Sequence, residues 1–156
     1  MSIRKILVPT DFGPASEAAL SHAIDLATAF GAGITLLHVY ESPVSFAYPG
    51  APFVPIDDIS NSLRENAERG VRSLVARTGE RLARVDGLVR QGSAWRNIND
   101  VAQELGFDLI VIGTHGRRGV PRALIGSVAE KLVRTSHVPV LTVHAPEAVP
   151  PASASA

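Results

Sequence analysis

The chain has 156 residues, no cysteine, and 15 basic against 15 acidic side chains, so its formal net charge is zero at pH 7. This length predicts one domain, and the balanced charge argues against a surface that holds nucleic acid or an anionic membrane. Without cysteine there are no disulfides or cysteine-ligated metals, and no apolar run reaches the roughly 18 residues of a membrane span. Residues 1–5 lead straight into an apolar run and leave no room for a signal peptide, so we expect a cytoplasmic protein without membrane insertion.

Apolar runs and stripes of helical period alternate along the chain. Pro14 suits the first turn of the first predicted helix, Gly31 suits its end, and Ser93 can cap the third helix. In chain order, the sequence predicts a strand over residues 3–8, a helix over 14–30, a strand over 34–39, a helix that begins near Asp57 or Asp58, a strand within 82–89, a helix over 93–105, a strand over 108–112, a helix that opens at Gly126-Ser127 and a strand over 138–143.

Strands that alternate with helices place the chain in the α/β class, because parallel strands need crossover connections. We expect one domain over residues 1–145, with a single open five-stranded parallel sheet, Rossmann-like, and helices on both faces. Residues 41–55 are rich in proline, glycine and aromatic side chains and are predicted as a lid or as an inert insertion. Residues 146–156 are too poor in apolar side chains to order themselves and are expected to form a disordered tail.

The glycine-rich segment after residues 108–112 carries the clearest functional signal. Gly113-Thr114-His115-Gly116 follows a predicted strand, and nine residues later Gly126-Ser127 opens a helix. Glycine lets backbone N–H groups approach an anion, and a helix start adds unpaired N–H groups and a positive dipole end. The spacing is neither a G-x4-G-K-[ST] loop nor a dinucleotide G-x-G-x-x-G. We therefore expect a nucleotide site at the C-terminal end of a parallel strand.

The spacing G-x2-G-x9-G-[ST] resembles the signature of the universal stress protein family, in its nucleotide-binding branch. Further blocks resemble the family in the same order, over residues 5–11, 36–39, 127–134 and 138–143. The resemblance implies the strand order 3-2-1-4-5. That order sets the first and fourth strands side by side with connections that diverge, and such a crevice is where open sheets bind ligands.

Asp11 ends the first predicted strand above that crevice. Its carboxylate can accept hydrogen bonds from ribose hydroxyls or the adenine edge, or it can be the N-cap of the helix that follows. The resemblance assigns Asp11 to the nucleoside. It also places Pro9 and Val39 beside the adenine, with the Val39 backbone N–H and C=O available to the base. Thr10 lies in the same loop and belongs to the predicted nucleotide site.

Gly113 and Gly116 are predicted to let the backbone pass under the ribose and phosphates, or to form a tight turn that needs positive φ. Ser127 either contacts phosphate or forms a capping box with Glu130, in which its hydroxyl bonds a helix amide. Under both interpretations, an anion meets the amides that follow Gly126, namely those of Ser127, Val128 and Ala129.

Cationic side chains lie within the glycine segment. Arg117, like Arg118 and Arg122, either faces the phosphates or is solvated, and the same two interpretations apply to His115. No nucleophile–base pair or pair of carboxylates stands near the glycine loop, and the other histidines lack metal-ligand spacing. We therefore assign no catalytic and no metal-binding residue.

The expected function is that of an ATP-binding universal stress protein, a regulatory nucleotide-binding module of the stress response that takes ATP with or without Mg2+. One alternative is a slow ATPase or nucleotide-transferring enzyme, against which the missing catalytic groups weigh. Another is a nucleotide-free dimeric adaptor, against which the intact glycine motif weighs. The resemblance also implies a homodimer through residues 138–143, an apolar strand at the sheet edge that pairing would cover.

Overall fold

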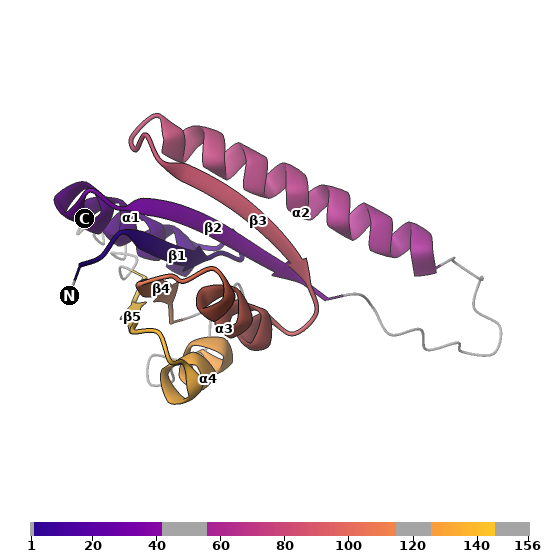
Figure 1. Cartoon of the computed structure of the whole chain (residues 1–156). Helices are drawn as coiled ribbons and strands as arrows, with labels where there is room; N and C mark the ends of the chain where they lie inside the picture. The colour runs from indigo at the N-terminus through magenta and orange to yellow at the C-terminus, as the bar shows by residue number, and fades with distance from the viewer. Residues whose placement is uncertain (1, 42–55, 115–125, 146–156) are drawn as a thin grey trace, which may run out of the picture.

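The computed structural model describes residues 2–41, 56–114 and 126–145, in which strands alternate with helices (Figure 1). Most of the predicted lid, the span 115–125 and the predicted tail lie outside the described residues. In chain order the elements are β1 (Lys5–Pro9), α1 (Pro14–Phe30), β2 (Gly33–Tyr40), α2 (Ile56–Gly79), β3 (Val85–Gln91), α3 (Ala94–Glu104), β4 (Leu109–Gly113), α4 (Ser127–Thr135) and β5 (Val140–Val143).

The strands form one parallel sheet in the order β3-β2-β1-β4-β5, which confirms the predicted class and strand order. In β1, Leu7 lies opposite Thr35 of β2 on one side and Ile110 of β4 on the other. The chain leaves β1 through α1 toward β2 and leaves β4 through α4 toward β5, so the two connections diverge at the carboxyl ends of β1 and β4. Open parallel sheets bind ligands at such a divergence.

Helices cover both faces of the sheet (Figure 1), and the core lies in two layers, one on each face. Ile6 and Val8 point into the layer under α1 and α2, whereas Leu7 points into the layer under α3 and α4. All three side chains are fully buried, because helices cover both faces of the sheet and so bury the side chains on either side of the strand. β1 therefore fixes both helix layers relative to its own carboxyl end.

Two helix boundaries follow from single residues. Pro14 occupies the first turn of α1, where its missing N–H leaves no helical bond unmade. Gly31 ends the same helix with φ of 64°, in the left-handed region that glycine tolerates. Ser93 lies at the N-cap of α3 as predicted, but its side chain makes no capping hydrogen bond.

β1 and β5 begin two residues later than the sequence predicted, and β3 ends two residues beyond the predicted span 82–89. β3 runs through Gly87, which lets α2 pack closely, since a Cβ there would lie 2.4 Å from Val71 Cγ1. Before β5, the Ser136 hydroxyl donates to Val138 O at 2.9 Å and accepts the Val138 N–H at 3.1 Å. The chain turns at these bonds, so the strand starts only after Pro139.

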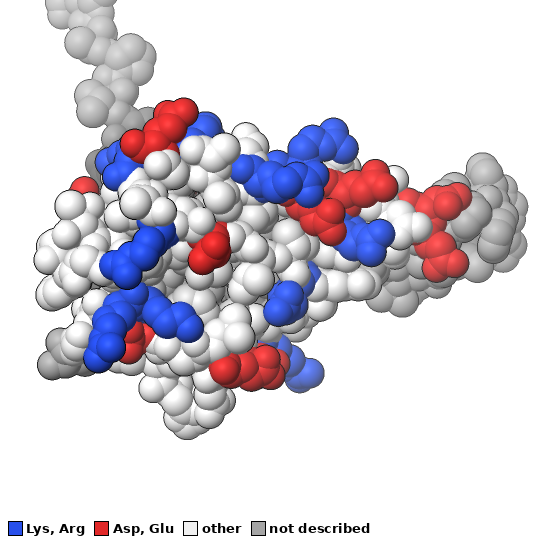
Figure 2. All heavy atoms as spheres, turned by 45° about the horizontal axis from the view of Figure 1, so that its top comes forward, with Lys and Arg blue, Asp and Glu red and all other residues white. Residues whose placement is uncertain are grey.

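α2 extends past the end of the sheet (Figure 1) and carries charges of both signs on its exposed side (Figure 2). Arg72 pairs with Glu68 of the previous turn at 3.6 Å, and the two side chains are exposed. Positive and negative side chains therefore mix on the face that α2 presents. Among the helices of the described residues, none combines the length and the apolar character that a bilayer crossing needs.

A carboxylate ties β1 to β4 at their amino ends. Asp108 accepts the backbone N–H groups of Arg4 and Lys5 at 2.8 and 2.9 Å. These two hydrogen bonds favour the ionised form and lower the pKa of Asp108 below its ordinary value of 3.8. The bonds fix the start of β1, at the end of the sheet away from the divergence of the connections.

Candidate functional site

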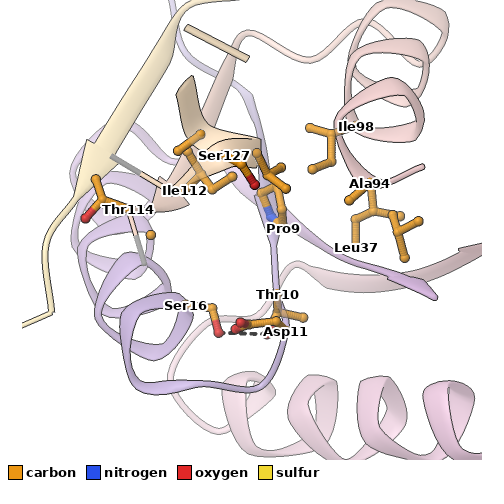
Figure 3. Close-up of a pocket in the computed structure, with 15 residues that line it drawn as sticks. Pro9, Thr10, Asp11, Ser16, Leu37, Ala94, Ile98, Ile112, Thr114 and Ser127 are labelled. Atoms are coloured by element: carbon orange, nitrogen blue, oxygen red, sulfur yellow. Dashed lines mark hydrogen bonds between the residues drawn. The ribbon is translucent and has the colours of Figure 1, made fainter. Parts of the chain in front are cut away.

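A cavity of about 200 Å³ opens where the sheet connections diverge. It is lined by the β1–α1 junction, the end of β2, the start of α3, the end of β4 with Thr114, and the start of α4 with Gly126 (Figure 3). The predicted site residues that line it are Pro9, Thr10, Asp11, Val39, Gly113, Gly126, Ser127, Val128 and Ala129. The other predicted candidates lie outside the described residues and are His115, Gly116, Arg117, Arg118 and Arg122.

One wall of the cavity is apolar (Figure 3). Ala94 and Ile98 of α3 lie on the same side as Leu37 of β2, and Ile112 of β4 and Pro9 of β1 continue this wall. Ile98 and Leu37 are almost fully buried. Such a wall suits a flat, weakly polar ring better than a charged group, because a charge buried without a partner is costly.

The opposite corner is polar and is formed by the β1–α1 junction (Figure 3). The Thr10 hydroxyl donates to Ser16 Oγ at 3.2 Å, and Ser16 donates to the Gly13 carbonyl at 2.9 Å. Asp11 Oδ1 accepts the Gly13 N–H at 2.9 Å. The N-cap of α1 is Gly13, so the interpretation of Asp11 as the N-cap is wrong, and its carboxylate instead closes a turn before the helix.

The start of α4 faces the same cavity and has no side-chain cap. Gly126 is the N-cap, with φ of −56° and ψ of 145° and no capping hydrogen bond from a side chain. The first helical bond runs from the Glu130 N–H to Gly126 O at 2.9 Å, so the helix itself uses none of the three preceding amides. The capping box predicted for Ser127 is wrong, because Ser127 is already the first helical residue. These amides, at the positive end of the helix dipole, border the cavity.

Gly113 has a packing role that the sequence did not reveal. A Cβ at this position would lie 2.5 Å from the carbonyl carbon and oxygen of Ala15, in the first turn of α1. Its φ is not positive, unlike that of Gly31, so the tight-turn interpretation is wrong for this glycine. The missing side chain lets α1 approach β4, and this contact brings the two helix starts to one cavity.

Several lining residues were missed by the sequence reasoning, namely Ser16, Leu37, Ala94, Ile98, Ile112 and Thr114. Thr114 lies inside the glycine motif, and this position was a usable signal. Its side chain is buried and Oγ1 lies 2.7 Å from His144 Nδ1, while its N–H donates to Val143 O at 2.9 Å. Ala94 and Ile98 gave no signal, because an apolar stripe on a helix looks the same whether it meets the core or a ligand. Among the described residues, no cluster of three or more His, Asp or Glu is placed to hold a metal ion.

Comparison with known proteins identifies the family. The model of the family described as "Universal stress protein family" matches residues 2–144. The chain belongs to the universal stress protein family. It is 31% identical over 144 residues to universal stress protein MJ0531 of Methanocaldococcus jannaschii, and the match covers 92% of this chain and 84% of that protein.

Solved structures of this family share the fold. Protein MJ0577, also of Methanocaldococcus jannaschii, superposes with a TM-score of 0.79 at 25% identity and covers 95% of this chain and 100% of its own. A universal stress protein in complex with cAMP superposes with a TM-score of 0.59 at 23% identity, over 94% of this chain and 100% of its own. The five-stranded order seen here is therefore an architecture that solved universal stress proteins share.

Proposed function

We propose that this chain binds ATP in the cavity and acts as a regulatory nucleotide-binding module of the stress response. One observation carries the proposal: a single cavity joins an apolar wall to a helix start whose first amides have no side-chain cap. A nucleotide has the same two-part chemistry, a flat base at one end and anionic phosphates at the other. The glycine spacing of the sequence lies at the phosphate end.

The nucleoside would occupy the side formed by β1, β2 and α3. The β1–β2 ladder ends where the Thr10 N–H donates to Leu37 O at 2.8 Å. Backbone groups of alternate strand residues point to the same side, so Val39 directs its N–H and C=O past the end of β1. These two groups can pair with the edge of a base, and the carboxylate of Asp11 can accept ribose hydroxyls.

The phosphates would lie at the start of α4. The amides of Ser127, Val128 and Ala129 precede the first helical bond and can each donate to a phosphate oxygen. A cavity of about 200 Å³ is smaller than the roughly 300–1,000 Å³ of typical ligand sites, so a triphosphate would extend out of it. Mg2+ would bind together with the nucleotide, held by the phosphate oxygens, as is common in nucleotide sites.

The described groups favour binding over hydrolysis. Asp11 is the single carboxylate among the described lining residues, and one of its oxygens already accepts the Gly13 N–H. Phosphoryl transfer needs a positioned water and acids that hold the metal ion, in addition to a place for the phosphates. We therefore assign the cavity to retention of ATP, with slow hydrolysis as the alternative.

A homodimer through β5 is part of the same proposal. β5 lies at the edge of the sheet, and Leu141 at its centre is 38% exposed. Pairing with a second copy would cover this edge. Leu141→Asp is expected to shift the mass in sedimentation equilibrium from two chains toward one, while Thr142→Ser at the next position leaves it unchanged. A wild-type chain that sediments as a monomer at tens of micromolar would contradict the dimer.

Calorimetric titration with ATP, adenosine and cAMP tests the ligand, and phosphate release tests turnover. ATP is expected to bind more tightly than adenosine, because it alone reaches the α4 amides with a phosphate chain. It should also bind more tightly than cAMP, whose single phosphate is closed onto the ribose. Binding of none of the three would support the nucleotide-free adaptor, tighter binding of cAMP would reassign the ligand, and rapid phosphate release would support the enzyme.

A further inference from the structure

Phe12, beside the cavity, has an unusual backbone conformation. Its φ is 61°, and it is the single residue other than glycine with positive φ in the part of the chain that the structure describes. An aromatic residue is strained in this left-handed region and stays there only where its surroundings hold it. Phe12 directly follows Asp11, so whatever holds Phe12 also sets the direction in which the chain leaves Asp11.

The Phe12 ring is held between His38 and the space above Gly70. On one side the ring stacks on His38 of β2, with 4.5 Å between centroids and 34° between planes. On the other it fills the space above Gly70 of α2, where a Cβ would lie 2.7 Å from the ring. Glycine is the least favourable residue after proline inside a helix, and here its lack of a side chain makes room for the ring.

His38 also forms a hydrogen bond with the residue that follows β1. Its Nδ1 lies 2.7 Å from the Thr10 carbonyl oxygen, and because a carbonyl only accepts, Nδ1 carries the proton. Thr10 is thus bound to β2 through its N–H, to Leu37 O, and through its C=O, to His38. Its hydroxyl accepts the Phe12 N–H at 3.0 Å, which closes the link from β2 to Phe12.

We infer that Phe12, His38 and Gly70 are positioning residues for nucleoside recognition: they hold the turn at Thr10 and Asp11 so that the Asp11 carboxylate faces the cavity. The inference rests on the proposed function. It adds that α2, which supplies no described residue of the cavity lining, sets the affinity for the nucleoside through the Phe12 ring. A nucleotide site at the carboxyl ends of the strands is thereby coupled to a helix that supplies none of its described lining residues.

Two pairs of variants test this by calorimetric titration with ATP and with adenosine. Gly70→Ala should push the Phe12 ring and weaken both ligands by the same factor, whereas Gly79→Ala, with nothing within 4 Å of its added Cβ, should change neither. His38→Leu removes the bond to Thr10 O and should weaken both ligands roughly five- to tenfold. His38→Asn carries an amide nitrogen on the same carbon as Nδ1 but lacks the ring that contacts Phe12, so it should restore part of the binding that His38→Leu loses.

A double-mutant cycle separates positioning from a general loss of structure. If His38 acts through Asp11, His38→Leu should cost nothing further in an Asp11→Ala background. Additive losses would overturn the inference, as would unchanged affinity in folded Gly70→Ala or failure of His38→Asn to restore binding. If His38→Leu does not fold, the ligand affinities of Gly70→Ala and Gly79→Ala still test the inference. A wild-type chain that binds neither ligand would overturn the proposed function as well, which distinguishes that failure from one confined to the positioning residues.

Discussion

Two helices begin at the edge of the same cavity, and their starts differ in the acidic side chains that lie beside them. At α1, the Gly13 N–H donates to the Asp11 carboxylate, Pro14 has no N–H to donate, and the first helical bond runs from the Glu17 N–H to Gly13 O at 3.0 Å. At α4, the first helical bond likewise runs from the Glu130 N–H to Gly126 O, and neither helix has a side-chain cap. The difference is that the sequence has no acidic residue among residues 109–126, which precede α4.

The difference assigns the two ends of a nucleotide. A helix start carries about half a positive charge, which an anion neutralises favourably. At α1 the chain supplies its own anion in Asp11, so a phosphate there would meet a carboxylate. At α4 the preceding residues 109–126 include no acidic side chain, so phosphates are expected there and the nucleoside beside Asp11.

Gly113→Ala should produce the largest effect, because this glycine brings the two helix starts together. The added Cβ would lie 2.5 Å from the Ala15 carbonyl and force α1 away from β4. We expect the free energy of unfolding in urea to fall by about 1–3 kcal/mol and ATP binding to weaken with it. Gly79→Ala is the control, and a Gly113→Ala chain of unchanged stability would contradict the packing role.

Gly126→Val perturbs the α4 start alone. The branched side chain would lie beside the open amides, so ATP should bind at least tenfold more weakly, which is about 1.4 kcal/mol. Adenosine, which has no phosphate, should bind as it does to the wild type. Titration calorimetry measures both ligands and circular dichroism checks the fold. Equal ATP affinity in a folded variant would exclude the α4 start as the phosphate site.

Asp108→Asn should produce the smallest effect and sharpens the comparison, because Asp108 also accepts backbone amides but lies away from the cavity. The hydrogen bonds from Arg4 and Lys5 lower its folded pKa below 3.8, so their stabilisation is complete above the unfolded pKa and is lost as the pH falls through the lowered value. The stability difference from wild type in urea should be constant between about pH 6 and 8 and shrink below about pH 4. ATP affinity should not change, and an ATP defect at neutral pH would show that the effects are not local.

Much of the fold was predictable from the sequence. Strands that are buried on both faces are continuous apolar runs, whereas helices with one buried face carry apolar residues every three or four positions. The order of the strands came from the family resemblance, because periodicity carries no information on which strands are neighbours. The sequence bounded β3 poorly because Gly87 weakens the apolar pattern there. The reason for this glycine lies in its contact with Val71 of α2, a residue distant in sequence.

The candidate site was predictable where its chemistry is local. The glycine spacing pointed to the start of α4, and Asp11 followed from its place at the end of a strand. The contact of Phe12 with His38 and Gly70 was not predictable from the sequence. It joins three segments that are distant in sequence, and it requires a positive φ at Phe12, which no sequence pattern indicates. The capping box failed by a single residue, because both Gly126 and Ser127 are acceptable N-caps in sequence.

The ratio of adenosine to ATP dissociation constants, measured by calorimetry in Asp11→Ala and Ser127→Pro, tests the central claim most directly. Proline suits the first helical position and the extended Gly126 before it, so Ser127→Pro deletes one amide and little else, while Ser127→Ala keeps that amide as the control. Loss of one hydrogen bond to a charged phosphate should lower the ratio about tenfold in Ser127→Pro. Asp11→Ala should weaken both ligands by a similar factor and leave the ratio unchanged. A ratio that falls in Asp11→Ala, or stays constant in Ser127→Pro, would contradict the assignment of the two helix starts.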